Sequence, residues 1–188
     1  MRRTFLIYSL FALFFAACDR PSSLETPEYI KWCNASNELI KSNSMAGVYL
    51  WVKYIPSDFF VASGKQVEST NQSGLHFQVE IRTEDGLDML SGTSGDPSYF
   101  ERLSYINSKI QKDFKLIINQ SDTLDCALAH LERTYGVGKD RISLEFPSEG
   151  IKKIESISFQ YDDHLFQVGR INVNYSQKDL SHIPTLKL

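Results

Sequence analysis

Residues 75–82 (LHFQVEIR) decide the fold, because their side chains alternate strictly between apolar and polar. A period of two is typical of a β-strand that has one buried face and one solvated face. Here the apolar positions are Leu75, Phe77, Val79 and Ile81, and the polar positions are His76, Gln78, Glu80 and Arg82. Residues 84–86 (EDG) supply a turn after the strand. The segment therefore predicts a strand that covers a hydrophobic core on one side.

A second decisive segment precedes it, at residues 48–55 (VYLWVKYI). This run is apolar on both faces apart from Lys53, which predicts a central strand covered on both sides, and Pro56 ends it. Short β-branched and aromatic runs predict further strands at residues 114–118, 142–146, 154–161 and 167–175. Most of the chain is therefore expected to build sheets.

Two helices are predicted from capping residues and from apolar stripes with helical spacing. Thr26 is the expected cap of the first helix, Pro27 is its first residue, and Asn43 and Gly47 bracket its end; its stripe consists of Tyr29, Trp32, Cys33, Ser36 and Ile40. The second starts at Asp96 and Pro97; its stripe consists of Tyr99, Leu103, Ile106 and Ile110. Both helices are expected to pack against the sheets.

Residues 124–135 permit two interpretations. Leu124, Ala127, Leu128, Leu131 and Tyr135 fit a helical stripe. Alternatively, residues 114–119 turn through residues 120–123 and return as an antiparallel strand, with Ala127, Ala129 and Leu131 facing inward. The hairpin is favoured, because the strand at residues 114–118 needs a partner and a short connection supplies one.

These elements predict one globular domain over residues 26–188, with an α+β fold. The expected architecture is a strand-rich antiparallel sandwich or curled sheet with two helices packed against it. The composition, 42% hydrophobic and 23% charged, excludes wholesale disorder.

Residues 1–17 predict a secretory signal peptide. Arg2 and Arg3 form a positive start, and residues 5–17 (FLIYSLFALFFAA) form an apolar run. A spanning helix needs about 20 apolar residues, so this run is too short for a permanent anchor. Without the signal, 18 basic residues face 23 acidic ones, a net charge of −5. This balance argues against binding to nucleic acid.

The end of this segment places two small residues directly before a cysteine, in residues 15–18 (FAAC). The pattern resembles the lipobox of bacterial lipoproteins, although Phe15 stands where that pattern usually has an aliphatic residue. The resemblance covers residues 1–18 and implies cleavage before Cys18, whose thiol receives a diacylglycerol with fatty chains such as palmitate. A conventional signal peptide is the alternative, but its cleavage site prefers a small residue at the position of Phe15.

The resemblance also implies a cellular location. Residues 18–25 would be a lipidated tether, and the domain would be anchored to a bacterial membrane in the cell envelope. Asp19 resembles the inner-membrane retention signal of enteric lipoproteins, but this rule varies between bacteria, so the choice between inner and outer membrane stays open. The oligomeric state is open as well.

Two cysteines remain beyond the lipid site. Cys33 and Cys126 are an even pair in an exported protein and could form a disulfide, which would close a long loop. Alternatively, each is a small buried hydrophobe.

The sequence contains few candidate catalytic or metal-binding residues. His130 and Glu132 share a face in the hairpin interpretation, as do His76 and Glu80, and either pair could supply two metal ligands or a base with an orienting carboxylate. The favoured interpretation is that both pairs are ordinary polar residues on solvated strand faces. No CxxC, HExxH, P-loop or GxGxxG pattern occurs, so the sequence predicts no cofactor.

The sequence thus favours a non-catalytic envelope lipoprotein that acts as a binding, adaptor or assembly component, with the membrane and other envelope proteins as partners. The alternative is an envelope-anchored, metal-dependent hydrolase that uses His130 and Glu132. A weaker alternative is a eukaryotic secreted glycoprotein, for which four N-x-S tripeptides begin at Asn34, Asn71, Asn119 and Asn174.

Overall fold

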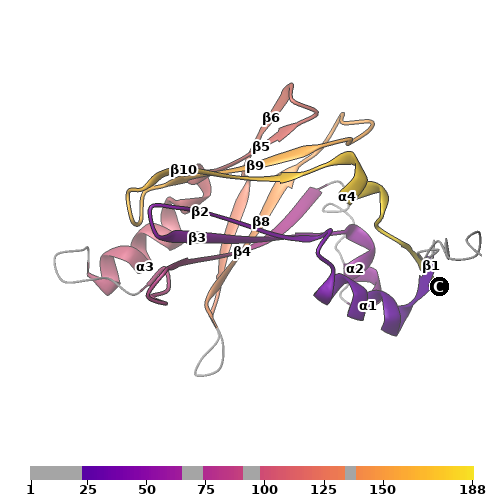
Figure 1. Ribbon diagram of the computed structural model, residues 1–188, viewed down its shortest axis with the longest axis horizontal. Coiled ribbons are helices and arrows are strands. Elements are labelled where there is room, and N and C mark those ends of the chain that lie inside the picture. The colour runs from indigo at the N-terminus through magenta and orange to yellow at the C-terminus, as the bar shows by residue number, and fades with distance from the viewer. Residues whose placement is uncertain (1–22, 65–73, 91–97, 134–138) are drawn as a thin grey trace, which may run out of the picture.

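The computed structural model describes residues 23–64, 74–90, 98–133 and 139–188. Two antiparallel sheets pack face to face in these residues, as Figure 1 shows. The five-stranded sheet consists of β2 (Ile40–Met45), β3 (Val48–Ile55), β4 (Gly74–Thr83), β8 (Arg141–Pro147) and β7 (Leu128–Glu132), in that spatial order. The four-stranded sheet consists of β10 (Gly169–Tyr175), β9 (Ile157–Asp163), β5 (Phe114–Ile118) and β6 (Asp122–Asp125). The predicted strand-rich α+β fold is confirmed.

Short helices lie at the two ends of these sheets. The described residues form α1 (Thr26–Ala35), α2 (Ser57–Ala62), α3 (Tyr99–Ser108), α4 (Gln177–Ser181) and a 3₁₀ helix, η1 (Ile110–Asp113). In Figure 1, α3 lies at one end of the molecule, and α1, α2 and α4 lie at the other. None of the helices in the described part of the chain is long and apolar enough to span a bilayer.

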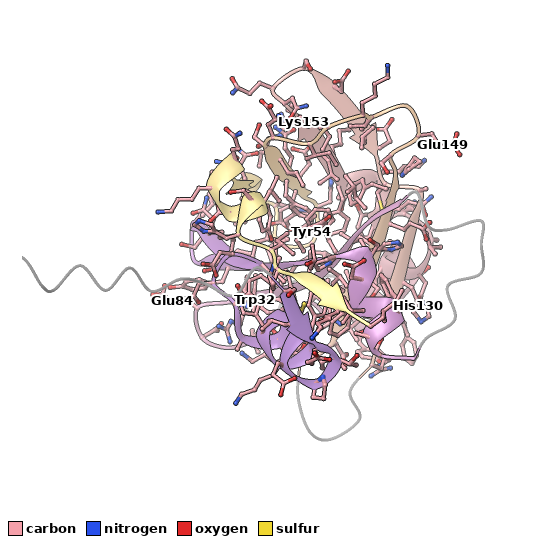
Figure 2. The ribbon with its side chains drawn as sticks, turned by 90° about the vertical axis from the view of Figure 1, so that its right-hand side faces the viewer. Trp32, Tyr54, Glu84, His130, Glu149 and Lys153 are labelled. Atoms are coloured by element: carbon pink, nitrogen blue, oxygen red, sulfur yellow. The ribbon has the colours of Figure 1, made fainter. Side chains whose placement is uncertain are left out.

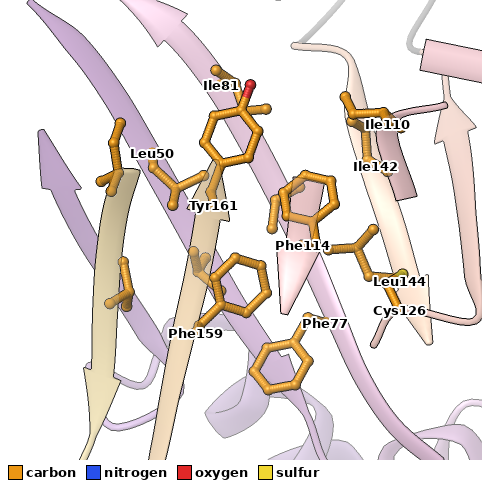
Figure 3. Close-up of a cluster of buried hydrophobic side chains, with 14 of the residues drawn as sticks. Leu50, Phe77, Ile81, Ile110, Phe114, Cys126, Ile142, Leu144, Phe159 and Tyr161 are labelled. Carbon is orange, nitrogen blue, oxygen red and sulfur yellow. The ribbon is translucent and has the colours of Figure 1, made fainter. Parts of the chain in front are cut away.

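The main core fills the space between the two sheets, as Figure 3 shows. Phe77 of β4 lies at its centre and is fully buried. Its ring contacts Phe146 of β8 and Phe159 of β9, with centroid distances of 5.8 and 5.2 Å. The strand predicted from the alternation of residues 75–82 is therefore confirmed, because every second side chain of β4 packs into this core.

The sheets are also tied together along one edge. The hydroxyl of Tyr175 on β10 donates to the carbonyl oxygens of Leu39 and Val52, at 3.1 Å each. The amide of Asn43 on β2 donates to the carbonyl oxygen of Asn172 on β10, at 2.8 Å. These contacts hold β10 beside β2.

The first predicted helix is too long. It ends at Ala35, and Ile40, which was assigned to its stripe, is the first residue of β2. The reason is strand pairing: β2 and β3 form a hairpin around Ala46 and Gly47, both of which have positive φ, as tight hairpin turns require. Thr26 is the first helical residue rather than the cap.

The second predicted helix begins later than expected. Asp96 and Pro97 lie outside the described residues, and the N-cap is Ser98, which forms a capping box with Glu101. Tyr99 is exposed, although the stripe predicts it to be buried, and Arg102 is buried instead, at 2% exposed. Leu103 and Ile106 pack against the core as predicted, and Ile110 is buried in η1, so the predicted apolar face departs from the structure only at Tyr99.

The hairpin interpretation of residues 124–135 is confirmed in part: the described residues of this segment form strands rather than a helix, but only β6 pairs with β5. β5 turns through residues 119–121 into β6, with positive φ at Asn119 and Gln120. The chain then crosses to the five-stranded sheet, where β7 pairs with β8. Ala129 and Leu131 pack against the core as expected, but Ala127 is exposed because it lies in the crossover between the sheets.

The predicted signal peptide, Cys18 and most of the predicted tether lie outside the described residues. The described body begins at Ser23, three residues before the predicted start of the domain. β1 (Ser23–Glu25) pairs in parallel with β11 (Thr185–Lys187), and Glu25 forms an ion pair with Lys187 at 2.7 Å. The end of the predicted tether is thus part of the folded body.

Candidate functional site

The candidate site lies on the outer face of the five-stranded sheet, opposite the core. Strand register arranges its side chains in rows across the strands. One row consists of Ile55, His76, Glu145 and Leu128, from β3, β4, β8 and β7 in turn. The next row consists of Lys53, Gln78, Ser143 and His130. Polar residues from four strands therefore share one surface.

Helices α1 and α2 turn part of this surface into a pocket of about 370 Å³, here called the sheet pocket. Asn34 of α1 and Phe59 and Phe60 of α2 contribute to its wall, together with the two rows. Figure 2 shows His130 at the surface beside α2. The volume falls near the lower end of the range for small-molecule sites, about 300–1,000 Å³.

Lys53 is the most unusual group in the pocket. It is 7% exposed, although lysine is rarely buried without an acidic partner. Its Nζ donates to Oδ1 of Asn34 at 2.7 Å and lies 5.2 Å from the ring centroid of Phe59. Within the described residues, Nζ has no carboxylate within ion-pair distance. Burial therefore lowers the pKa of the Lys53 ammonium.

A hydrogen-bonded group lies further along the sheet. Glu132 accepts hydrogen bonds from the Ser143 hydroxyl and from Nε2 of Gln78, the latter at 2.7 Å. Nη1 of Arg141 is 3.4 Å from Oε1 of Gln78, and its guanidinium lies 5.3 Å from the ring centroid of Trp51. These charged groups are already bound by the sheet itself.

Three titratable side chains of the pocket have much weaker contacts. Glu145 and His130 make no side-chain hydrogen bond or ion pair with any residue that the structure describes, and His76 only contacts the ring of Phe60, at 4.8 Å between centroids. Gly74 leaves room for two of them: an added Cβ would meet Oε1 of Glu145 and Nε2 of His76, each at 3.4 Å. These groups are available to a ligand.

The structure places the two polar pairs predicted from the sequence differently. His130, Glu132 and His76 all line the sheet pocket, so the alternating pattern placed them on the correct face. Glu80 lies outside the pocket and is 7% exposed; its carboxylate oxygens lie 3.1 Å from Lys139, 3.7 Å from Arg82 and 3.9 Å from Arg141. In the described segments, no group of three or more His, Cys, Asp or Glu side chains is arranged to hold a metal ion.

The disulfide considered for Cys33 and Cys126 is not present, since both are free thiols. Cys33 packs on α1 with Tyr29 and Leu39 in a small second cluster, whereas Cys126 belongs to the main core (Figure 3). Burial raises the pKa of Cys33 to about 11 and that of Cys126 to about 12, so both stay protonated at neutral pH. Each is a small buried hydrophobe.

Lys53 was not predicted as a site residue. Its signal was present in the sequence, as the one charged residue in the apolar run of residues 48–55. The side chains that surround it come from α1 and α2, and α2 was not predicted at all. The apolar run predicts that this strand is covered on both sides, but without α2 it does not indicate which residues cover the outer face near Lys53.

No protein-family model matches the chain, and no curated protein matches it. Two solved structures are similar to it. One is a DUF4426 family protein from Pseudomonas aeruginosa PAO1, with 9% identity over 74% of this chain and 95% of that chain, and a TM-score of 0.42. The other is a protein of unknown function from Burkholderia pseudomallei K96243, with 12% identity over 86% of this chain and 93% of that chain, and a TM-score of 0.42.

Proposed function

We propose that this chain is a lipid-anchored, non-catalytic binding protein of a bacterial envelope, and that the sheet pocket holds its ligand. The observation that carries the proposal is the buried Lys53 ammonium, which meets a neutral amide and an aromatic ring in the described residues. A buried charge without a counter-charge costs free energy. A ligand carboxylate would supply the counter-charge, so the pocket is suited to bind an anionic group.

The anchor supports an adaptor or assembly role. The lipid on Cys18 would be separated from the described body, which starts at Ser23, by four residues. An extended chain reaches about 3.5 Å per residue, so the body would stay within about 20 Å of its lipid attachment. Such a short tether would hold the pocket close to the membrane surface and to neighbouring envelope proteins.

The anchor is tested by comparing the natural chain with Cys18→Ser. We expect the natural chain to partition into detergent and to yield an N-terminal peptide with the mass of an acylated Cys18, and the variant to stay in the aqueous phase. An unmodified thiol, or processing elsewhere, would contradict the anchor.

The pocket is tested by calorimetric titration with phenylacetate, which joins a carboxylate to an apolar ring. We expect saturable binding that is lost in Lys53→Met and kept in Lys115→Met, a matched lysine on β5 that lies outside the pocket. Equal heats in all three proteins, or no binding in any of them, would contradict the proposal.

One observation favours a second candidate, a metal-dependent hydrolase: His76, His130 and Glu132 line the same pocket. The weakness of this candidate is that both oxygens of Glu132 already accept hydrogen bonds from Ser143 and Gln78. Metal analysis of the protein as purified separates the two candidates. One equivalent of zinc that is lost in His130→Ala would favour the hydrolase, and metal-free protein would favour the binding protein.

A further inference from the structure

The charges that line the sheet pocket are balanced in sign: Lys53 and Arg141 are cationic, and Glu132 and Glu145 are anionic. Two of them already have partners within the sheet. Glu132 accepts from Ser143 and Gln78. Arg141 lies 3.9 Å from Glu80 and contacts Gln78 and the face of Trp51, although its Nε makes no hydrogen bond. A ligand gains little by pairing with these two, because it would have to replace existing contacts.

The other two charges lack a charged partner in the described residues. The Lys53 ammonium has three N–H donors, and one of them is used, on Asn34. The Glu145 carboxylate makes no side-chain hydrogen bond or ion pair there. Lys53 is on β3 and Glu145 on β8, with β4 between them and an offset of two residues along the strands, so their backbones are about 12 Å apart. The pocket thus has one positive pole and one negative pole.

We infer that the ligand of the sheet pocket is a small zwitterion, whose carboxylate pairs with Lys53 and whose ammonium pairs with Glu145. This inference rests on the proposed binding function and names its ligand class. A bound simple anion would shield the half-buried Glu145 from water without pairing with it, and a simple cation would leave the buried Lys53 unpaired, each at a cost in desolvation. A zwitterion satisfies both poles and leaves the pocket neutral.

The remaining lining indicates that the ligand also carries an apolar side chain. The ring of Phe59 faces Lys53, and the ring of Phe60 lies edge-on to His76, with 71° between their planes. Ile55 and Leu128 lie at the two ends of the row that contains His76 and Glu145, and Leu128 is 54% exposed. Amino acids and short peptides with an apolar side chain share this chemistry.

The test compares three probes by calorimetry on the lipidated full chain in detergent: L-phenylalanine, N-acetyl-L-phenylalanine and L-phenylalaninamide. The second probe lacks the ammonium and the third lacks the carboxylate. We expect phenylalanine to bind at least about tenfold more tightly than either analogue, because each analogue loses one charge-assisted contact.

Two variants test which residue of the pocket binds which charged group of the ligand. Lys53→Met should abolish the preference for phenylalanine over its amide, and Glu145→Gln should abolish the preference over the N-acetyl form. Lys115→Met and Glu155→Gln, which change exposed residues outside the pocket, should leave both preferences unchanged. A fourth probe, alanylphenylalanine, separates the two sources: tighter binding than phenylalanine assigns the site to peptides, and weaker binding assigns it to free amino acids.

The outcomes separate this inference from the proposed function. N-acetyl-phenylalanine could bind as tightly as phenylalanine, with Glu145→Gln changing neither affinity. In that case the ligand is not a zwitterion, but the carboxylate site at Lys53 stands. If none of the probes binds to the folded protein, both are overturned.

Discussion

The two faces of β4 are built from alternate residues of one strand, yet they differ sharply in chemistry. Toward the second sheet, Leu75, Phe77, Val79 and Ile81 are each at most 5% exposed and lie in the main core. On the outer face, His76 and Gln78 line a pocket whose polar groups are only partly satisfied. The comparison indicates that the inner face stabilises the fold, whereas the outer face is free to hold groups that stability alone would not select.

The largest effect is expected from Phe77→Ala on the inner face. Phe77 is fully buried and contacts Tyr54, Phe146, Phe159 and Tyr175, so truncation should leave a cavity and lower the free energy of unfolding by about 3–5 kcal/mol. Urea denaturation monitored by circular dichroism measures it. Phe100→Ala is the control, since Phe100 is 77% exposed. Equal losses in both variants would remove the distinction between the faces.

The next effect is expected from Tyr175→Phe, which tests the edge where the two sheets meet. Its buried hydroxyl contacts the carbonyl oxygens of Leu39 and Val52, which would both lose a donor. We expect a loss of about 1–2 kcal/mol in the same urea experiment. An unchanged free energy would show that the contacts between β10 and β2 do not contribute to stability.

A smaller effect of opposite sign is expected from Lys53→Met on the outer face. Without a ligand, the buried ammonium costs stability, so a methionine of similar length should raise the free energy of unfolding by about 1 kcal/mol at neutral pH. Destabilisation at neutral pH would contradict the view that Lys53 serves a ligand rather than the fold.

The difference in free energy of unfolding between Lys53→Met and the chain should also depend on pH. Burial lowers the pKa of Lys53 in the folded state, so the unfolded chain holds this proton more tightly. The contribution of Lys53 to stability should therefore rise as the pH increases from its lowered folded pKa toward about 10.4, the value in an unfolded chain. The advantage of Lys53→Met should shrink over this range, which unfolding curves at several pH values measure. A difference that is independent of pH would mean that the Lys53 pKa is not lowered by burial.

The smallest effect is expected from His130→Ala. His130 is exposed on β7 and has no side-chain hydrogen bond among the described residues, so its removal should change the free energy of unfolding by less than about 0.5 kcal/mol. A loss above 1 kcal/mol would show that the outer face also contributes to stability.

The sequence predicted the strands better than the helices, for a local reason. Alternation in residues 75–82 and the apolar run at residues 48–55 are visible within one strand, and both strands form where expected. The end of α1 depends on pairing between β2 and β3, which no helical stripe can reveal. The cap at Ser98 does have a local signal, the capping box with Glu101, but Asp96 and Pro97 offer a competing helix start in the sequence.

The site was predictable in part for the same reason. Strand periodicity placed His130 and Glu132 on one face of their strand and His76 on the polar face of another, but only the order of β4, β8 and β7 in the sheet brings them together. The apolar run at residues 48–55 predicted a covered strand, but not the contacts of Lys53, because these come from Asn34 of α1 and from Phe59 of α2, a helix that the sequence did not reveal.

Unfolding of the chain and of Lys53→Met, with and without saturating phenylacetate, tests the central claim most directly. Both proteins would carry Cys18→Ser so that they can be measured without detergent. We predict that phenylacetate at 100 times its Kd raises the free energy of unfolding of the chain by about 2.7 kcal/mol. Lys53→Met should be more stable than the chain without phenylacetate and should gain nothing from it. A variant that is less stable and gains as much as the chain would contradict the assignment of Lys53 to a ligand.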